Sequence, residues 1–594
     1  MPKKFNDARV ISILLFLLLL PACAAPANTQ RFNADTVEWV HIDDIADTYY
    51  YEGDLDAEQA QLKNWLDSDG NWDEIQKYLD NLTEANLQVI SALGIQDIYS
   101  IKDVNDLNAQ KAYEKLSTLS DTLYDHQKSM IKLVIESKYV NNFTKLYGQD
   151  IVNCINAEEG VDLDIPEENL IIQQRQDAFV ADYNLTYKGE DWTFQKLWED
   201  EELSDEDYWT INDGLCAKKN KALGELLLSL VKARNEAVDD AGLGDYPTLM
   251  HQAYSYRDYS LEDVISLCEE IKNSKLPEIL GKVNEAYKSE YNNYHELNNS
   301  IVEYNGTAGI DFFKQLAEVT RTRSETIGKI AAGLQENKLY FYDSYKNGVY
   351  APMMMPLTAY GLGAIYTPKD STVLDSQALY HEFGHFCNAV IAAPKGNVEK
   401  LRDLFIGGGI PLELDSYGME NLILQDYETI YGDYAPAVKL YFLQYALHCI
   451  ISSALYSEFE ISLYRDPPES LEEANARFTD LEEAYGGNLS LEGIPQGMTW
   501  AEVSHYFSSQ LYYPNYLTAM LPAMGSMVNS MESTEDQYDK YIHLLEIGGS
   551  LPYRELLKEV GMQDPFNEGV VEALSVDIEK YVDKTIANFN TYRQ

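Results

Sequence analysis

The sequence is poor in basic residues. Its 594 residues include 45 Lys and Arg against 97 Asp and Glu, which gives a formal net charge of −52 at pH 7. Nucleic acids and anionic lipid surfaces are bound by clustered cations that neutralise phosphate charge. We therefore expect no nucleic-acid partner and no attachment to a membrane through protein charge. The composition favours cationic or neutral partners instead.

Cysteine is also scarce, and no Cys-x-x-Cys pair occurs among the 6 Cys. A chain of this length buries enough apolar surface to fold without disulfide bridges. We therefore expect mainly buried free thiols. With 45% hydrophobic and 24% charged residues, the composition is that of an ordinary globular protein.

Long apolar runs are missing except near the N-terminus, where residues 11–20 are almost purely apolar. This run is shorter than the roughly 20 residues that a membrane-spanning helix needs. Lys3, Lys4 and Arg9 precede it. A short basic region followed by a short apolar run is the pattern of an export signal.

Residues 20–23 (LPAC) resemble the cleavage box of bacterial lipoproteins. The resemblance implies a signal peptide over residues 1–22, lipidation of Cys23 and a polar tether over residues 23–45. The alternative is an ordinary secretory signal that is cleaved near Ala25. We expect an exported protein of the cell envelope, which contacts the membrane only through its lipidated N-terminus.

Most of the remaining sequence has the periodicity of amphipathic helices. Apolar residues recur at helical spacing in residues 108–137 and 261–294, for example. We expect an N-terminal helical region over residues 46–220. A second region, residues 221–594, carries the chemistry described below.

A small β-sheet is expected to interrupt this helical pattern. Residues 338–345 and 349–355 flank Asn347-Gly348, a pair that suits a type I′ turn, and they predict a β-hairpin. Residues 363–367 (GAIYT) predict another short strand, just upstream of the motif at 381–385. The sequence thus predicts a mainly α fold with a small sheet beside that motif.

The motif His381-Glu382-Phe383-Gly384-His385 predicts a metal site on a helix. Side chains at positions i and i+4 share one helix face, so His381 and His385 can converge on one Zn²⁺. Glu382 projects beside them, where it can act as a general base towards water on the zinc.

A third ligand is needed to complete such a site. Glu413 lies at the start of a predicted helix, residues 411–424, whose Pro411 suits the first turn. A carboxylate there would complete a His-His-Glu site and leave the fourth position open to water. We expect one zinc ion per chain.

These motifs resemble the thimet oligopeptidase and oligoendopeptidase F family of zinc peptidases. The match comprises HEFGH and, about thirty residues later, the spacing of Glu413, Ser416, Glu420 and Asn421. Residues 231–259 resemble the family's Arg-Asn helix at Arg234-Asn235, although Val238 replaces an alanine. Residues 500–519 resemble the family's segment of one histidine followed by tyrosines. The likeness covers roughly residues 220–530.

The resemblance implies that His381, His385 and Glu413 are the zinc ligands. It also implies that Glu382 is both general base and general acid. It further implies that His505, together with Tyr512 or Tyr516, stabilises the tetrahedral intermediate. One such donor is typically worth about 2.7–4 kcal/mol. Glu420 or Asp415 would orient a ligand histidine.

The fold implied by the resemblance is a two-lobed helical clam with a deep substrate channel and the metal helix at its floor. Family members hold the peptide backbone with a short strand before the metal helix. Gly363, Ala364 and Ile365 occupy the matching place in this sequence. Strand addition binds a peptide through its backbone rather than through its side chains.

The sequence therefore predicts a zinc-dependent oligopeptidase that cleaves internal bonds of short peptides as a monomer and favours basic peptides. One alternative is a carboxydipeptidase of the same superfamily, which needs a cation for the substrate's C-terminus that the sequence does not identify. The other is a non-catalytic peptide-binding lipoprotein, which would have no use for Glu382.

Overall fold

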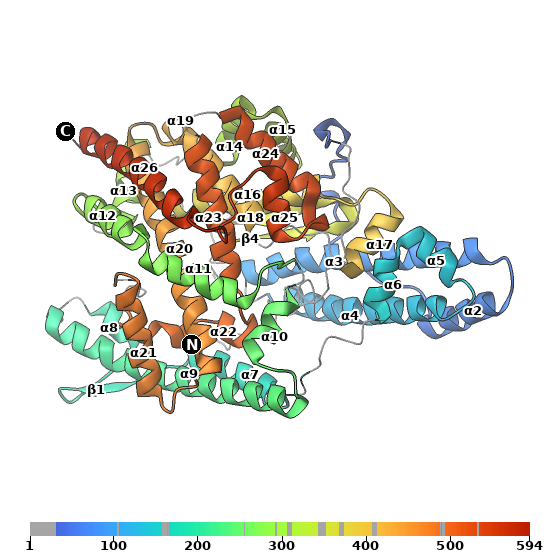
Figure 1. Ribbon diagram of the computed structural model, residues 1–594, viewed down its shortest axis with the longest axis horizontal. Helices are drawn as coiled ribbons and strands as arrows, with labels where there is room; N and C mark the ends of the chain where they lie inside the picture. Colours follow the sequence, from blue (N-terminus) through green and yellow to red (C-terminus); the bar gives the residue numbers. More distant parts are fainter. Residues whose placement is uncertain are drawn as a thin grey trace.

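The computed structural model describes residues 31–103, 106–156, 163, 165–200, 202–254, 256–291, 294–305, 312–342, 352–367, 373–406, 413–487, 489, 493–530 and 534–593. The predicted signal peptide, Cys23 and the Asn347-Gly348 turn lie outside these residues. The fold is mainly helical, with an upper lobe, a lower lobe and a projecting group of helices (Figure 1).

The described N-terminal residues are folded against the body of the protein. They form two 3-10 turns, η2 (Ala34–Thr36) and η3 (Ile42–Asp44). The ring of Trp39 stacks on Phe386 with centroids 6.5 Å apart, and the Ile42 N–H donates to the Asn337 carbonyl at 2.9 Å. The prediction of a polar tether over residues 23–45 is therefore wrong for its second half, because apolar side chains such as Trp39 pack there.

The projecting group lies at the right of Figure 1 and has its own core. Its helices are α2 (Leu55–Asp67), α3 (Trp72–Lys102), α4 (Leu107–Ile135), α5 (Val140–Tyr147), α6 (Gln149–Asn156) and α17 (Asn397–Ile406). Asp54 and Asp106 accept backbone N–H bonds at the N-termini of α2 and α4. Leu401 and Phe405 of α17 complete the buried cluster of α2 to α6, which ties this group to the later part of the chain.

The lower lobe contains the longest helix. Its elements are α7 (Glu168–Phe179), β1 (Leu185–Tyr187), β2 (Glu190–Trp192), α8 (Phe194–Glu199), α9 (Asp205–Ala241), α10 (Tyr246–Ala253), α21 (Leu471–Ala484), η7 (Thr499–Glu502) and α22 (His505–Ser508). Helix α9 starts at the Ser204 cap and ends at Gly242, whose φ of 68° terminates it. It runs unbroken across residue 220, so the boundary predicted there does not separate two domains.

The upper lobe holds most of the remaining helices. They are α11 (Leu261–Asn273), α12 (Leu276–Lys288), α13 (Tyr294–Asn305), α14 (Phe312–Arg323), α15 (Glu325–Glu336), α16 (Val373–Ile391), α18 (Leu414–Ile423), η5 (Leu424–Asp426), α19 (Tyr427–Tyr431), η6 (Gly432–Tyr434), α23 (Tyr513–Ser530), α24 (Thr534–Ile547), η8 (Gly548–Ser550), α25 (Tyr553–Val560) and α26 (Val570–Tyr592). Helix α18 lies at its centre, where it packs on α16 on one side and on α23 on the other.

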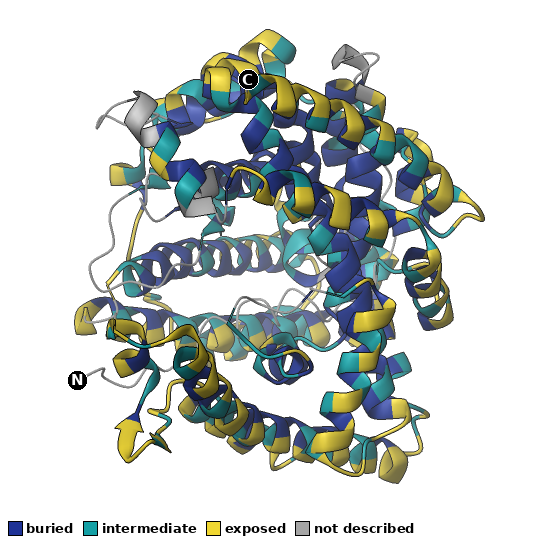
Figure 2. Cartoon of the chain, turned by 90° about the vertical axis from the view of Figure 1, so that its left-hand side faces the viewer, coloured by how far each residue is buried: buried dark blue, intermediate teal, exposed yellow. Residues whose placement is uncertain are grey.

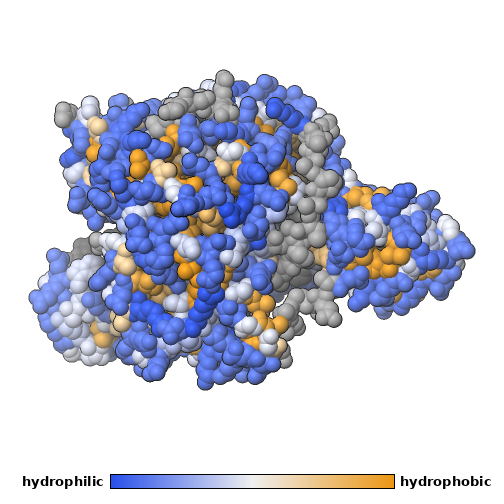
Figure 3. All heavy atoms as spheres, viewed as in Figure 1, coloured by the Kyte–Doolittle hydropathy of each residue, from blue (hydrophilic) through white to orange (hydrophobic). Residues whose placement is uncertain are grey.

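Helix α20 (Ala435–Arg465) joins the two lobes, because it packs on α23, α12 and α26 above and on α9 and α21 below. Among the described residues, one helical run, Leu414–Arg465, is apolar and long enough to cross a membrane. Its most apolar window is 67% buried inside the fold, as expected of a core helix. Buried residues fill the interior between the helical layers (Figure 2), whereas the face seen in Figure 3 is mainly hydrophilic.

A three-stranded sheet lies beside α16 in the order β3-β5-β4, with β3 (Tyr340–Phe341), β4 (Met353–Leu357), β5 (Leu362–Tyr366) and the turn η4 (Thr358–Tyr360). Strand β5 confirms the strand predicted at residues 363–367. The predicted hairpin is wrong, since β3 and β4 each pair with β5 rather than with each other. The later strand inserts between them, which local turn signals cannot reveal. The mainly α fold with a small sheet beside the motif is confirmed.

The cysteines of the described chain are free thiols, as the composition predicts. They are Cys154, Cys216, Cys268, Cys387 and Cys449, and all but Cys449 are buried. The hydrophobic core supplies the stability that disulfides provide in smaller exported domains.

Candidate metal centre

Helix α16 carries the two histidines of the motif on one face. It packs on β5 and, more closely, on α18. Gly384 permits this approach, because a Cβ at that position would lie 2.5 Å from the Ser416 Cα and 2.6 Å from the Asp415 carbonyl oxygen. The start of α18 is thereby brought against the motif.

His381, His385 and Glu413 form a group whose ligand atoms all lie within 4.8 Å of one another. The Oε2 atom of Glu413 is 3.2 Å from His381 Nε2 and 3.8 Å from His385 Nε2. Glu413 stands at the N-cap of α18 with a φ of 72°, a left-handed conformation that is uncommon outside glycine. Its strained backbone turns the carboxylate towards the two imidazoles.

The Nδ1 atoms of both histidines have carboxylate partners. His381 Nδ1 lies 2.6 Å from Glu420 Oε1, and His385 Nδ1 lies 3.1 Å from Asp415 Oδ1. Each contact fixes a ring orientation in which Nε2 faces Glu413. Carboxylate-oriented histidines are the usual surroundings of a protein-bound metal ion.

The charges of this group call for a cation. Burial disfavours protonated His385, yet the nearby carboxylate of Asp415 raises its pKa to about 9. Burial likewise disfavours ionised Glu413, yet its hydrogen bond and charge interaction with His381 hold its pKa at about 2. As metal ligands the two imidazoles are neutral, and the three buried carboxylates of Glu413, Asp415 and Glu420 then carry a negative charge that a divalent cation would balance.

Glu382 lies between the two histidines in sequence and is buried, with 7% of its surface exposed. Burial raises the pKa of its carboxyl above the ordinary value. The backbone of Met354, in strand β4, lies near this carboxylate and slightly lowers its pKa, against the larger effect of burial. Glu382 therefore lies between the predicted metal ligands and the edge of the sheet.

The predicted histidine and tyrosines come from α22 and the start of α23. The Tyr512 hydroxyl donates to Glu413 Oε1 at 2.8 Å, whereas the Tyr516 hydroxyl lies 3.5 Å from His505 Nε2. Burial lowers the pKa of His505 to about 4, so this imidazole is neutral near pH 7. Tyr512 contacts a predicted metal ligand, while His505 and Tyr516 form a pair beside it.

The strand predicted to bind the peptide backbone occupies the middle of the sheet. Ile365 pairs with Tyr340 of β3 on one side and with Met354 of β4 on the other. Gly363 and Ala364 are buried, so a peptide cannot add to β5 and this prediction is wrong. Among the described strands, β4 pairs with β5 alone and is the edge nearer to Glu382.

Three neighbours of the metal group, Ser416, Tyr417 and Met354, had no predicted role in the site. The ring of Tyr417 makes an edge contact with His381 at 5.2 Å between centroids, and Ser416 donates to Glu413 Oε2 at 3.2 Å. Tyr417 follows Glu413 by four positions, a helical spacing that could have indicated it. The contact from Met354 depends on the order of the strands and has no local signal.

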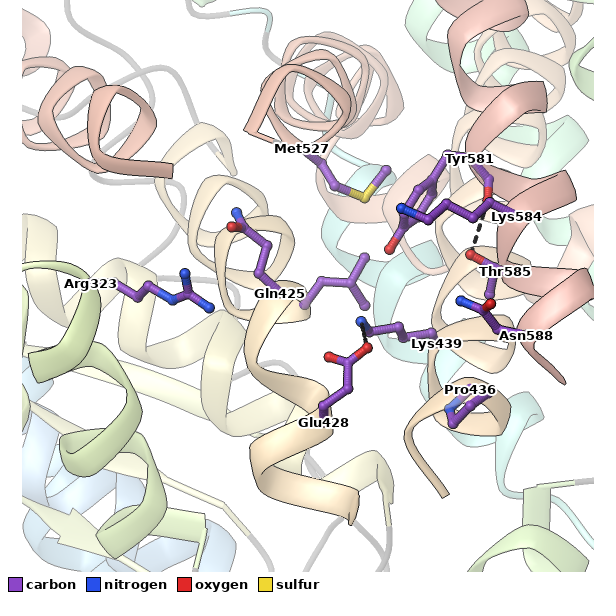
Figure 4. A pocket seen from close by; sticks show the side chains of 11 residues that line it. Arg323, Gln425, Glu428, Pro436, Lys439, Met527, Tyr581, Lys584, Thr585 and Asn588 are labelled. Carbon is purple, nitrogen blue, oxygen red and sulfur yellow. Dashed lines mark hydrogen bonds and ion pairs between the residues drawn. The ribbon is translucent and has the colours of Figure 1, made fainter. Parts of the chain in front are cut away.

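A separate hollow of about 300 Å³ lies near the C-terminal ends of α18 and α23 (Figure 4). It shares no residue with the metal group. Two of its cations are paired, Arg323 with Asp426 at 2.8 Å and Lys439 with Glu428 at 2.5 Å. The hollow is thus distinct from the metal group.

No family model and no curated protein matches the sequence. Solved structures do match. A protein assigned as an oligoendopeptidase F superposes with a TM-score of 0.67 at 18% identity, covering 92% of this chain and 100% of that chain. The chain has the oligoendopeptidase F fold. PZ peptidase A with an inhibitor gives a TM-score of 0.67 at 18% identity, covering 90% and 98% of the two chains.

The oligoendopeptidase F fold is also shared, at greater distance, by metallocarboxypeptidase 1 of Trypanosoma cruzi. That structure has a TM-score of 0.52 and 13% identity, and the match covers 86% of this chain and 99% of that one. The sequence resemblance and the structural likeness therefore agree on one fold.

Proposed function

We propose that this protein is a metal-dependent peptidase that hydrolyses internal bonds of short peptides. The observation that carries the proposal is the His381, His385 and Glu413 group, with Glu382 beside it and near an edge strand. The peptidase names of the structural neighbours support the same class. We further propose that the metal is one Zn²⁺ per chain, which suits two imidazoles and a carboxylate.

When bound there, Zn²⁺ would polarise a peptide carbonyl and lower the pKa of a water molecule. Glu382 is placed to accept the proton that this water loses and to return it to the leaving amine. Burial raises the pKa of its carboxyl, which makes the carboxylate a better acceptor of this proton.

His505 and Tyr516 are proposed to stabilise the negative charge that develops on the carbonyl oxygen of the scissile bond. Their Nε2 and hydroxyl groups lie 3.5 Å apart and come from neighbouring helices. We propose that Tyr512 does not stabilise this charge, since its hydroxyl bonds to Glu413 Oε1. It would hold that ligand in position, as Glu420 and Asp415 hold the two histidines.

Strand β4 is proposed to bind the peptide backbone in place of β5. Its outer edge has no partner among the described strands, and its Met354 backbone lies near the proposed base. A peptide added there in β-fashion would bring its backbone alongside Glu382. Folded proteins would have to give up their own structure to bind in this way, which limits the substrates to peptides of roughly 6–20 residues.

The T. cruzi neighbour is named a metallocarboxypeptidase, which favours removal of C-terminal residues as the second candidate function. The remaining proposals come from the sequence. They are an exported protein anchored in the cell envelope through Cys23, a monomeric state, and a preference for basic peptides because of the net charge of −52.

A peptide library tests the proposed function. The mature protein is stripped of metal, reloaded with one equivalent of Zn²⁺ and incubated with peptides of 5–40 residues, and the products are read by mass spectrometry. Internal cleavage of short peptides, restored by zinc, is the expected result. Trimming from the C-terminus would establish the second candidate. Binding without any cleavage would leave a peptide receptor and refute an enzymatic role.

A further inference from the structure

The segment from His505 to Tyr516 changes direction between α22 and α23. Leu511 has a φ of 56°, a conformation that costs energy for a branched residue and persists only when the surroundings enforce it. His505 and Tyr516 stand at the two ends of this turn. Their relative placement therefore depends on what holds the turn.

Arg234 of α9 holds the beginning of the segment. Its guanidinium is fully buried and uses all five of its N–H groups. Two of these bonds reach the carbonyls of Tyr506 at 2.8 Å and Phe507 at 2.6 Å, directly after His505. The others go to Glu168 and the Tyr464 hydroxyl. The Arg-Asn motif thus anchors α22.

Arg257 holds the middle of the segment. Its Nη2 donates to the Leu511 carbonyl at 2.8 Å and to Asn515 Oδ1 at 2.6 Å. Its Nη1 lies 3.1 Å from His251 Nδ1, while His251 Nε2 donates to the Tyr259 carbonyl at 2.8 Å. Burial lowers the pKa of His251 to about 4, which leaves the Nδ1 atom of the neutral ring free to accept from Arg257.

Glu460 of α20 holds the opposite side of the same turn. It is fully buried, and its Oε1 accepts the Leu511 N–H at 3.0 Å. Burial raises the pKa of Glu460 to about 8, so the carboxyl is largely protonated near pH 7. Leu511 is therefore fixed through its N–H by Glu460 and through its carbonyl by Arg257.

We propose that Arg234, Arg257 and Glu460 are positioning residues that hold His505 and Tyr516 in their catalytic arrangement. This inference rests on the proposed function. It assigns a role to the stretch 231–259, which contains none of the proposed catalytic residues yet supplies two of the three contacts. None of the three residues contacts the metal group directly. They act on the turn and reach the metal group only through Tyr512, whose hydroxyl bonds to Glu413, so the zinc-loaded protein should keep its one zinc.

The test uses Glu460→Ala, with Glu460→Gln as the conservative variant, in the zinc-loaded full-length protein. We expect Glu460→Ala to lower kcat about 10- to 100-fold, with KM within about twofold and one zinc retained, because it loosens the donors without removing them. Glu460→Gln keeps the acceptor for Leu511 and should recover most of kcat. Glu482→Ala is the matched control, since buried Glu482 likewise accepts a backbone N–H, from Gly497 at 2.8 Å. Its kcat should stay near that of the wild type.

A double-mutant cycle distinguishes positioning from general weakening of the fold. In a background that already lacks both donors, His505→Ala with Tyr516→Phe, the further loss caused by Glu460→Ala should be under about threefold, because the groups that Glu460 positions are already gone. The inference would be overturned if the kcat losses of the Glu460 substitution and the background multiplied. It would also be overturned if Glu460→Ala kept the wild-type kcat or lost its zinc. Should Glu460→Ala fail to fold, Arg257→Ala takes its place with the same criteria. A zinc-loaded wild type that cleaves no peptide would instead overturn the proposed function and, with it, this inference.

Discussion

Replacing Gly384 by alanine sets two physical effects against each other. Alanine favours a helix over glycine by about 1 kcal/mol, so the change should strengthen α16 in isolation. In the folded chain, however, the new Cβ would lie 2.5 Å from the Ser416 Cα, against the 3.4–4 Å of ordinary contact. The first turn of α18 must therefore retreat from α16 by about 1 Å. Overpacking of this kind typically costs about 1–3 kcal/mol, which exceeds the gain in helix propensity.

A displacement of α18 would move Glu413, which is the N-cap residue of this helix. Metal–ligand distances are held within about 0.2 Å, so a shift of about 1 Å between the histidines and the carboxylate should lower zinc affinity about 10- to 100-fold. Competition with a chromophoric chelator measures this affinity, and urea unfolding of the metal-free protein measures the stability. Gly281→Ala in α12 is the control, since nothing lies within 4 Å of its added Cβ. Wild-type zinc affinity in Gly384→Ala would show that this helix contact does not place Glu413.

Four further substitutions test the roles of other residues. Tyr512→Phe should lower zinc affinity about tenfold, whereas Tyr516→Phe should lower kcat about 10²-fold and leave zinc bound, as measured by chelator competition and peptide kinetics. Burial raises the pKa of Asp97 from 3.8 to about 7, so its folded form keeps a proton that the unfolded chain loses as pH rises through that window. Asp97→Asn should therefore add about 4 kcal/mol of unfolding free energy at pH 8 but only about 2 kcal/mol at pH 5; an equal gain at both would refute the assignment. Cys23→Ser should move the protein from the membrane to the soluble fraction, and unchanged fractionation would contradict lipidation.

The helical part of the fold follows from local patterns in the sequence. Amphipathic periodicity, the HEFGH helix and the caps at Asp54 and Ser204 are all encoded within a few residues. The position of β5 between β3 and β4 is not, because strand order depends on contacts between distant segments. The unbroken helix across residue 220 was missed for the related reason that a domain boundary is a property of packing.

The candidate site divides in the same way. The i, i+4 spacing placed His381 and His385 together, the start of a predicted helix suggested Glu413, and the resemblance added Tyr512 and Tyr516. The structure brings the first three together, with Tyr512 on Glu413 and Tyr516 beside His505. Spacing could not distinguish the two tyrosines, since their roles depend on which one points at Glu413. The contacts of Arg234 and Arg257 with the segment 505–516 could not be predicted either, because each joins residues more than 250 positions apart.

The proposal on which the others depend is that Glu382 acts as the general base of a zinc peptidase. Its most direct test compares the wild type with Glu382→Gln, each loaded with one equivalent of Zn²⁺, on a short peptide that the wild type cleaves. We expect equal zinc content, a similar KM and a fall in kcat of about 10²–10⁴-fold, since Glu382 is not among the metal ligands. Near wild-type turnover in the zinc-loaded variant would contradict this proposal.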